Sequence, residues 1–170
     1  MIKSILFFLL LFSISALFSQ TNYDKVDQFD AVKANWAKVK LNGKYGFIDK
    51  NGIEVVKTIY EEIDQFDIYQ NAWAQVKLNG KLGFINENGI EIVKPKYDKI
   101  DQFDIYKQGW AKVKLSGKFG FINKNGVEIV KPIYDEIEQF DIYQNGWARV
   151  KIKKQTNFID KNGIEVLGAK

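Results

Sequence analysis

The chain has 170 residues, 46% of them hydrophobic and 15% aromatic, and it contains neither cysteine nor histidine. These absences exclude disulfides, thiolate metal sites and every catalytic mechanism that needs a Ser-His, Cys-His or His-metal group. The formal net charge of +4 arises from 25 basic and 21 acidic residues that are interleaved without a basic block, which argues against nucleic acid as a partner.

The first 19 residues predict a secretory signal peptide. Lys3 precedes an apolar run over residues 5–18, and Ser19 offers a small residue for cleavage. The run is shorter than the roughly 20 residues needed to cross a bilayer, although an uncleaved anchor is the alternative. We therefore predict a signal peptide over 1–19 and a mature domain over 20–170. The protein would be secreted or held in the periplasm or cell envelope, and would contact the membrane only through the signal segment before cleavage.

The rest of the chain is a tandem repeat with a period of 37 residues. Four series of residues keep this step, namely a tryptophan, a phenylalanine, an Asn-Gly pair and a tyrosine. The series are Trp36, Trp73, Trp110 and Trp147; Phe47, Phe84, Phe121 and Phe158; Asn51-Gly52, Asn88-Gly89, Asn125-Gly126 and Asn162-Gly163; and Tyr23, Tyr60, Tyr97 and Tyr134. A fixed period of roughly 20 to 50 residues indicates an array whose units bury their apolar faces on one another.

The sequence of each unit predicts strands joined by tight turns. Residues 110–115, WAKVKL, alternate between two faces, as expected of a half-buried strand. The turn Ser116-Gly117 closes a hairpin onto residues 119–123, and Asn125-Gly126 turns the chain into a third strand that stops at Pro132. Residues 132–146 predict a short strand or turn, whose Tyr, Ile and Phe pack on the neighbouring unit, followed by a loop. The unit is thus a three-stranded antiparallel meander with a short fourth segment.

The phase of the repeat favours a closed ring. The mature chain begins within a unit, at 23–35, and ends within another, at 147–170, and together these two parts make one full period of 37 residues. A ring closes in this way when the N-terminal segment completes the last blade and leaves no exposed edge strand. We therefore predict an all-β fold of four units as a propeller-like or barrel-like ring, with an open β-array as the alternative.

Three successive units resemble a known bacterial family. GKYGFIDKNGIEVV, GKLGFINENGIEIVKPKYD and GKFGFINKNGVEIVKPIYD, which begin at Gly43, Gly80 and Gly117, are similar to the WG-containing repeat. The tryptophan for which that repeat is named is replaced here by Tyr45, Leu82, Phe119 and Thr156. The resemblance implies a β-rich binding or structural module of variable repeat number, without an assigned catalytic activity or catalytic residues.

Recurring acidic pairs are the remaining candidates for catalysis or calcium binding. They are Asp27 with Asp30, Asp64 with Asp67, Asp101 with Asp104, and Glu138 with Asp141. A catalytic dyad needs two carboxyl groups in different environments, whereas a repeated pair gives four similar surface sites. A single pair is also a weak calcium site, because calcium takes six or more oxygen ligands. We therefore expect no enzyme activity, no metal and no cofactor.

The aromatic residues are the candidates for a binding surface. Tyr69, Tyr106 and Tyr143 lie in loops between units, and Trp36, Trp73, Trp110 and Trp147 stand at the start of the first strand. Together they offer a platform for protein side chains or sugars, although the tryptophans are better explained as core between units. A basic stripe beside them is interrupted in the second unit by Gln75 and is better explained as a solvated strand face. It consists of Lys38, Lys40, Lys77, Lys112, Lys114, Arg149 and Lys151.

From these residues we predict an exported, non-catalytic module that binds protein or serves as a structural scaffold. The alternative is a carbohydrate-binding or glycan-binding module of the cell envelope. The expected partner is a protein or another envelope component such as a glycan, and not nucleic acid.

Overall fold

The computed structural model describes residues 22–70 and 72–166, and over these residues the chain is all β. Sixteen strands form four antiparallel sheets of four strands each. No described helix is long and apolar enough to cross a membrane. The predicted signal peptide over 1–19 lies outside the described residues.

Each sheet follows the order of its strands in the chain, and we number the sheets as units 1 to 4. Unit 1 contains β1 (Lys25–Val26), β2 (Trp36–Leu41), β3 (Lys44–Asp49) and β4 (Glu54–Tyr60). Unit 2 contains β5 (Glu62–Ile63), β6 (Trp73–Leu78), β7 (Lys81–Asn86) and β8 (Glu91–Tyr97). Unit 3 contains β9 (Lys99–Ile100), β10 (Trp110–Leu115), β11 (Lys118–Asn123) and β12 (Glu128–Tyr134). Unit 4 contains β13 (Glu136–Ile137), β14 (Trp147–Ile152), β15 (Gln155–Asp160) and β16 (Glu165–Val166).

The predicted hairpins are confirmed. Leu41 pairs with Lys44 around the two-residue turn Asn42-Gly43, where both residues have positive φ, 50° and 77°. Such turns match the right-handed twist of the flanking strands, and asparagine and glycine reach this conformation at least cost. The loop between β3 and β4 is longer, and in its Asn51-Gly52 pair glycine alone has positive φ, at 79°.

The short fourth segment belongs to the following sheet. Glu62 pairs with Lys77 and Ile63 pairs with Val76, so β5 opens unit 2 and does not extend unit 1. Only Glu61 separates β4 from β5. The segment 23–35 therefore supplies the first strand of unit 1, and each of the four units begins with such a strand.

Neighbouring units share their cores. One cluster joins Trp73, Phe84, Val93 and Tyr97 of unit 2 to Ile100, Phe103, Ala111, Val113 and Ile122 of unit 3. Tyr97, Phe84 and Ile122 in this cluster are at most 1% exposed. The prediction that the Tyr, Ile and Phe of the fourth segment pack between units is confirmed, and so is the assignment of the tryptophans to this inter-unit core.

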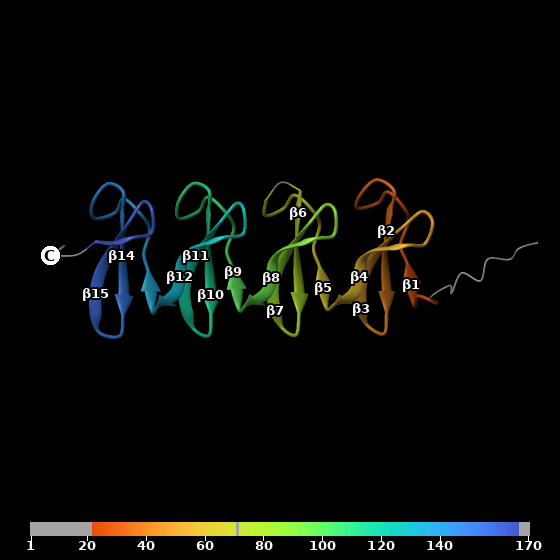
Figure 1. Ribbon diagram of the computed structural model, residues 1–170, viewed down its shortest axis with the longest axis horizontal. Coiled ribbons are helices and arrows are strands. Elements are labelled where there is room, and N and C mark those ends of the chain that lie inside the picture. The colour runs from red at the N-terminus through yellow and green to blue at the C-terminus, as the bar shows by residue number, and fades with distance from the viewer. Residues whose placement is uncertain (1–21, 71, 167–170) are drawn as a thin grey trace, which may run out of the picture.

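The closed ring predicted from the phase is wrong, and the open β-array describes the chain. Figure 1 shows the four sheets side by side along one axis, with unit 1 and unit 4 at opposite ends. Residues 25–26 pair with β2 of their own unit, and the last described strand, β16, pairs with β15. The two part-units that add up to one period are thus the start of unit 1 and most of unit 4. Successive units repeat one nearly linear step, which carries the two ends apart.

Candidate interaction surface

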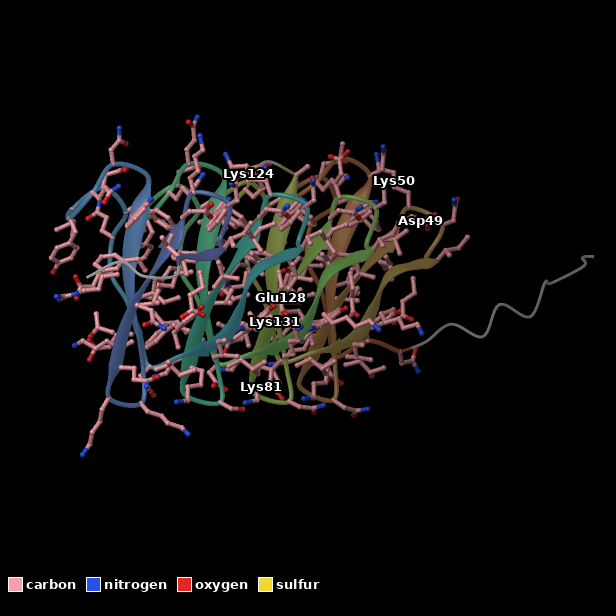
Figure 2. All side chains as sticks on the ribbon, turned by 60° about the vertical axis from the view of Figure 1, so that its left-hand side comes forward. Asp49, Lys50, Lys81, Lys124, Glu128 and Lys131 are labelled. Carbon is pink, nitrogen blue, oxygen red and sulfur yellow. The ribbon has the colours of Figure 1, made fainter. Side chains whose placement is uncertain are left out.

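One edge of the array is built entirely from loops. Because Trp36 pairs with Asp49 at the end of the sheet, the loop before β2 and the loop after β3 lie at the same edge. Figure 1 shows these two loops above every sheet, opposite the tight hairpin turns. Figure 2 places Lys50 and Lys124 at this edge and Lys81 at the opposite one. We call it the loop edge; it comprises 27–35, 50–53, 64–70, 72, 87–90, 101–109, 124–127, 138–146 and 161–164.

Each short loop of the loop edge is held by the last residue of the strand before it. Oδ1 of Asp49 accepts hydrogen bonds from the backbone N–H groups of Asn51 and Ile53, at 2.8 and 2.9 Å. Asn86 accepts the same two bonds in unit 2 through its amide oxygen, at 2.9 and 3.0 Å. Short polar side chains stabilise turns in this way.

Each long loop is held by the second acid of its predicted pair. The Asp104 carboxylate accepts a hydrogen bond from the Gly109 N–H and forms an ion pair with Lys124 at 2.9 Å. Asp104 itself has φ of 69°, a conformation that aspartate tolerates better than most residues. The accepted backbone hydrogen bond, with help from Lys124, lowers the pKa of Asp104 below its ordinary value.

The first acid of each pair has different partners. Asp64 accepts a hydrogen bond from the Tyr69 hydroxyl at 3.1 Å, and Asp101 forms an ion pair with Lys99 at 2.6 Å. Glu138 forms an ion pair with Arg149. The two acids of a pair thus bind different groups. Among the described residues there is no group of three or more Asp and Glu placed to hold a metal ion.

The tyrosines of the predicted surface lie against their own sheets. The rings of Tyr69, Tyr106 and Tyr143 lie 5.8, 6.0 and 6.1 Å from the rings of Phe84, Phe121 and Phe158. Tyr69 and Tyr106 are half-buried, whereas Tyr143 is 50% exposed. Burial, followed by the charge of a neighbouring aspartate, raises the pKa of both Tyr69 and Tyr106.

The tryptophans of the predicted surface are largely covered by the next unit. Trp36, Trp73 and Trp110 are 9%, 7% and 8% exposed. Trp110, for example, meets Phe140 of unit 4 edge-on at 5.7 Å. Trp147 is half-buried, because no described unit follows it.

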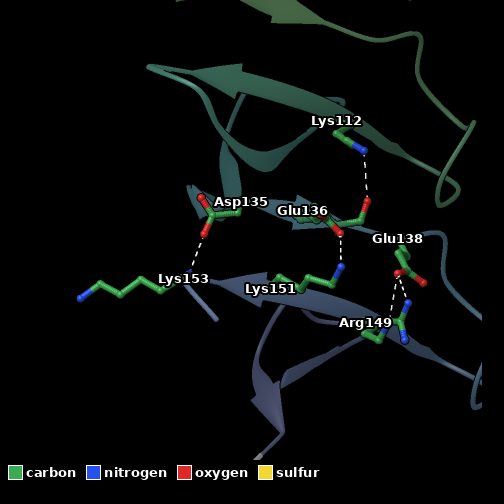
Figure 3. A network of polar contacts seen from close by, with 8 residues as sticks. Lys112, Asp135, Glu136, Glu138, Arg149, Lys151 and Lys153 are labelled. Carbon is green, nitrogen blue, oxygen red and sulfur yellow. Dashed lines mark hydrogen bonds and ion pairs between the residues drawn. The ribbon is translucent and has the colours of Figure 1, made fainter. Parts of the chain in front are cut away.

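The basic stripe connects neighbouring units. Nζ of Lys38 donates to the Ile63 carbonyl at 2.6 Å, and Nζ of Lys112 donates to the Ile137 carbonyl at 3.1 Å. Figure 3 shows the second of these bonds above the ion pair between Glu136 and Lys151. Burial lowers the pKa of Lys38 and Lys112. Gln75 occupies the same position in unit 2, and its buried Nε2 has no hydrogen-bond partner among the described residues.

Exposed aliphatic side chains on the loop edge were not predicted from the sequence. Two series recur with the period of 37 residues and are 51–64% exposed. They are Ile53, Ile90, Val127 and Ile164 in the short loops, and Ile68, Ile105 and Ile142 in the long loops. Their periodicity is visible in the sequence, but a recurring isoleucine is ordinarily interpreted as core.

Comparison with known families identifies the repeat. A model of the WG containing repeat matches residues 45–81, 83–119 and 119–154, which together make up more than half of the chain. The chain belongs to the WG-containing repeat family. The GW (Gly-Tryp) dipeptide domain also matches residues 17–54. No curated protein and no solved structure matches the chain.

The glycine that follows the namesake position of each WG repeat, such as Gly83 after Leu82, is required here by close packing between two strands. A Cβ atom on Gly83 would lie 2.4 Å from the Val93 carbonyl oxygen and 2.6 Å from the Pro95 nitrogen. The third and fourth strands of a WG unit therefore approach too closely for any side chain here. Unit 4 has Asn157 at this position. There Ile159 pairs with Glu165 as Ile85 pairs with Glu91, but the register shift that follows in unit 2 is absent between β15 and the two-residue strand β16.

We expect acid to weaken the short loops that begin with aspartate. Accepted backbone hydrogen bonds lower the pKa of Asp49 and Asp160 below the ordinary value of 3.8. A group with a lowered folded-state pKa stabilises the fold fully above its unfolded-state pKa, and this contribution is lost as the pH falls through the folded-state value. The loss therefore sets in below pH about 4.

The equivalent Asn86 and Asn123 accept the same bonds without titrating, which supplies matched variants. Urea unfolding at pH 7 and pH 2.5 should show a smaller acid-induced loss in the Asp49→Asn, Asp160→Asn variant than in the wild type. The Asn86→Asp, Asn123→Asp variant should show a larger loss. Equal losses in all three proteins would contradict this account.

Proposed function

We propose that this WG-repeat chain is an exported, non-catalytic protein-binding and scaffold module that contacts its partner through the loop edge. The observation that carries the proposal is the exposed aliphatic series there, with Ile68 and Ile105 each 51% and Ile142 59% exposed. Exposed apolar side chains that gather on one surface with a polar rim are typical of protein interaction sites. Because the units are equivalent, the surface offers the same contact several times, which favours an extended or repetitive partner.

Charged groups around the aliphatic side chains support a protein partner. Lys50 pairs with Asp30 at 3.4 Å, and Lys124 pairs with Asp104 at 2.9 Å. The loop edge therefore combines exposed aliphatic groups with charges of both signs. Protein interfaces have the same composition, an apolar centre within a polar rim.

The alternative function, glycan binding, has one supporting observation. Tyr143 is 50% exposed on the loop edge, and a sugar ring can stack on an exposed aromatic side chain. The Arg149 guanidinium, however, lies 4.5 Å from the centre of the Tyr143 ring, and Lys112 Nζ lies 4.4 Å from that of Tyr106. Charged groups thus occupy ring faces that a sugar would need, so we favour protein.

The proposal that the chain is not an enzyme rests on its residue inventory. It has no histidine and no cysteine, and Ser116, the one serine after the predicted signal peptide, lies in a hairpin turn. The recurring carboxylates are used to hold loops and pair with lysines. Export is proposed from the N-terminal sequence alone.

We expect polar substitution of the long-loop isoleucines to weaken partner binding while leaving the fold intact. In the Ile68→Gln, Ile105→Gln, Ile142→Gln variant, the affinity for a partner protein should fall at least about tenfold, because three apolar contacts are lost. The partner is first captured from envelope extracts of the producing organism, and binding is then measured by surface plasmon resonance. A glycan array with the same protein tests the alternative.

The matched control replaces two exposed isoleucines that lie on strands, Ile59 and Ile133, which are 39% and 46% exposed. The Ile59→Gln, Ile133→Gln variant should bind as the wild type does. An equal loss in both variants, or binding to a glycan alone, would refute the proposed protein-binding edge.

A further inference from the structure

Unit 1 contains a pocket lined by groups whose equivalents in units 2 and 3 contact a tyrosine. Its volume is about 240 Å³, and it is lined by Lys25, Asp27, Lys38, Val39, Lys40 and Tyr45. The equivalent residues of unit 3, two periods later in the chain, are Lys99, Asp101, Lys112, Val113, Lys114 and Phe119. Only the last position differs, by one hydroxyl group.

The two sets of side chains have nearly the same geometry. Lys38 Nζ lies 4.8 Å from the Tyr45 ring centre, and Lys112 Nζ lies 4.8 Å from that of Phe119. The next lysine of each strand, Lys40 or Lys114, lies 5.3 Å from the same ring. The ion pair at the start of the unit is also repeated, with Lys25 to Asp27 and Lys99 to Asp101 both at 2.6 Å.

The difference between the units is the residue that covers these groups. In unit 3 the Tyr106 ring centre lies 4.4 Å from Lys112 Nζ, and its ring packs edge-on against Phe121. In unit 2 the Tyr69 hydroxyl donates to Asp64, the equivalent of Asp27. Unit 1 has Val32 at this position, and Val32 packs against the core cluster of Trp36 and Phe47. A valine side chain has no ring to cover the lysine and no hydroxyl for the aspartate.

We propose that the pocket of unit 1 binds a phenolic ring from outside the array, with the ring against Lys38 and its hydroxyl donating to Asp27. Three tyrosines of this chain show that the surrounding framework accepts a phenol, because Tyr69, Tyr106 and Tyr143 occupy the equivalent position in the other units. A cation against an aromatic face and a phenol donating to a carboxylate are both favourable contacts. This inference concerns unit 1 alone and does not depend on whether the loop edge binds a protein.

An anion is the alternative ligand, because three lysines line the pocket. Lys25 is already paired with Asp27, and Lys38 already donates to the Ile63 carbonyl. Asp27 adds a negative charge where an anion would lie. These engaged groups favour a neutral phenol over phosphate or a carboxylate.

The test uses para-cresol, which is the tyrosine side chain cut off from the backbone, with Cβ as its methyl group. Binding to the purified protein is measured by ligand-observed NMR and calorimetry, with an expected Kd on the order of 1 mM for so small a ligand. Para-methylanisole, which lacks the donated hydrogen, should bind several-fold more weakly. Inorganic phosphate should not compete.

Two variants change the number of open pockets. Val32→Tyr fills the pocket of unit 1 from within and should reduce para-cresol binding at least tenfold, whereas Val32→Ala leaves it open and should bind as the wild type does. Tyr106→Val should open a second pocket in unit 3 and raise the stoichiometry from one to two. Unchanged binding in Val32→Tyr, or competition by phosphate, would overturn the proposal, as would a wild type that binds no phenol.

A capped peptide with the sequence Asp-Ile-Tyr-Gln-Asn distinguishes the two sources of a phenol. Binding of this peptide at least tenfold tighter than para-cresol would identify a tyrosine of a partner polypeptide as the occupant. Equal or weaker peptide binding would identify a free phenolic compound. Both results retain the phenol site, and either stands whether or not the loop edge binds protein.

Discussion

Gly89→Ala is expected to destabilise the protein much more than Gly52→Ala, although the two glycines are equivalent and have nearly the same φ, 76° and 79°. A Cβ atom on Gly89 would lie 2.3 Å from the Val55 carbonyl oxygen of unit 1. A Cβ atom on Gly52 would meet nothing within 4 Å, because no described unit precedes it. The pair therefore separates the cost of the backbone conformation from the cost of the clash between units.

Alanine in the left-handed region costs about 1–2 kcal/mol, and this loss should appear in both variants. The clash at residue 89 forces the two units apart and adds about 1–3 kcal/mol, by analogy with overpacked cores. Urea unfolding gives the free energy of unfolding of each variant. Equal destabilisation by the two substitutions would show that units 1 and 2 do not approach as described.

Trp73→Ala is expected to lower the free energy of unfolding by about 3–5 kcal/mol, as for other large buried aromatic side chains. Trp73 is 7% exposed and contacts Phe84 of its own unit at 5.3 Å and Phe103 of the next unit at 5.9 Å. Its loss opens a cavity in the core shared by units 2 and 3. The unfolding transition should also become broader, because coupling between neighbouring units gives a repeat array its cooperativity.

The matched variant is Trp147→Ala in unit 4. Trp147 contacts Phe158 of its own unit at 5.9 Å, and no described unit covers its other side. Since the side chain is half-buried, its removal should cost about half as much, roughly 1.5–2.5 kcal/mol. Thermal and urea unfolding of both variants check the difference. Losses of equal size would mean that the tryptophans stabilise single units and not the contacts between them.

The local structure of each unit is predictable because its determinants are local. The alternation of residues 110–115 gives strand β10, and the positive φ values of Ser116 and Gly117 give the hairpin turn that follows. The role of Tyr134, Ile137 and Phe140 as core between units is also predictable, since an isolated unit cannot bury them.

The binding surface is harder to predict from the sequence. Tryptophan and tyrosine recur with one period, yet within unit 3 Trp110 is 8% exposed while Tyr106 is only half-buried. The pattern of one unit does not tell which of its side chains the next unit covers. The exposure of the loop-edge isoleucines and the pocket of unit 1 likewise become visible only in the folded structure.

The amino-acid pattern is sufficient to specify the unit, its two turns, its strands and its family, because hydrogen bonding, turn conformation and alternation act over a few residues. The arrangement of the units in space was needed to establish that the short segment 62–63 pairs forward with β6 and that the array stays open. Closure depends on the small rotation between one unit and the next, which adds up along the chain. Contacts between units, such as the close approach of Gly89 to Val55, limit that rotation, and the pattern of a single unit does not specify them.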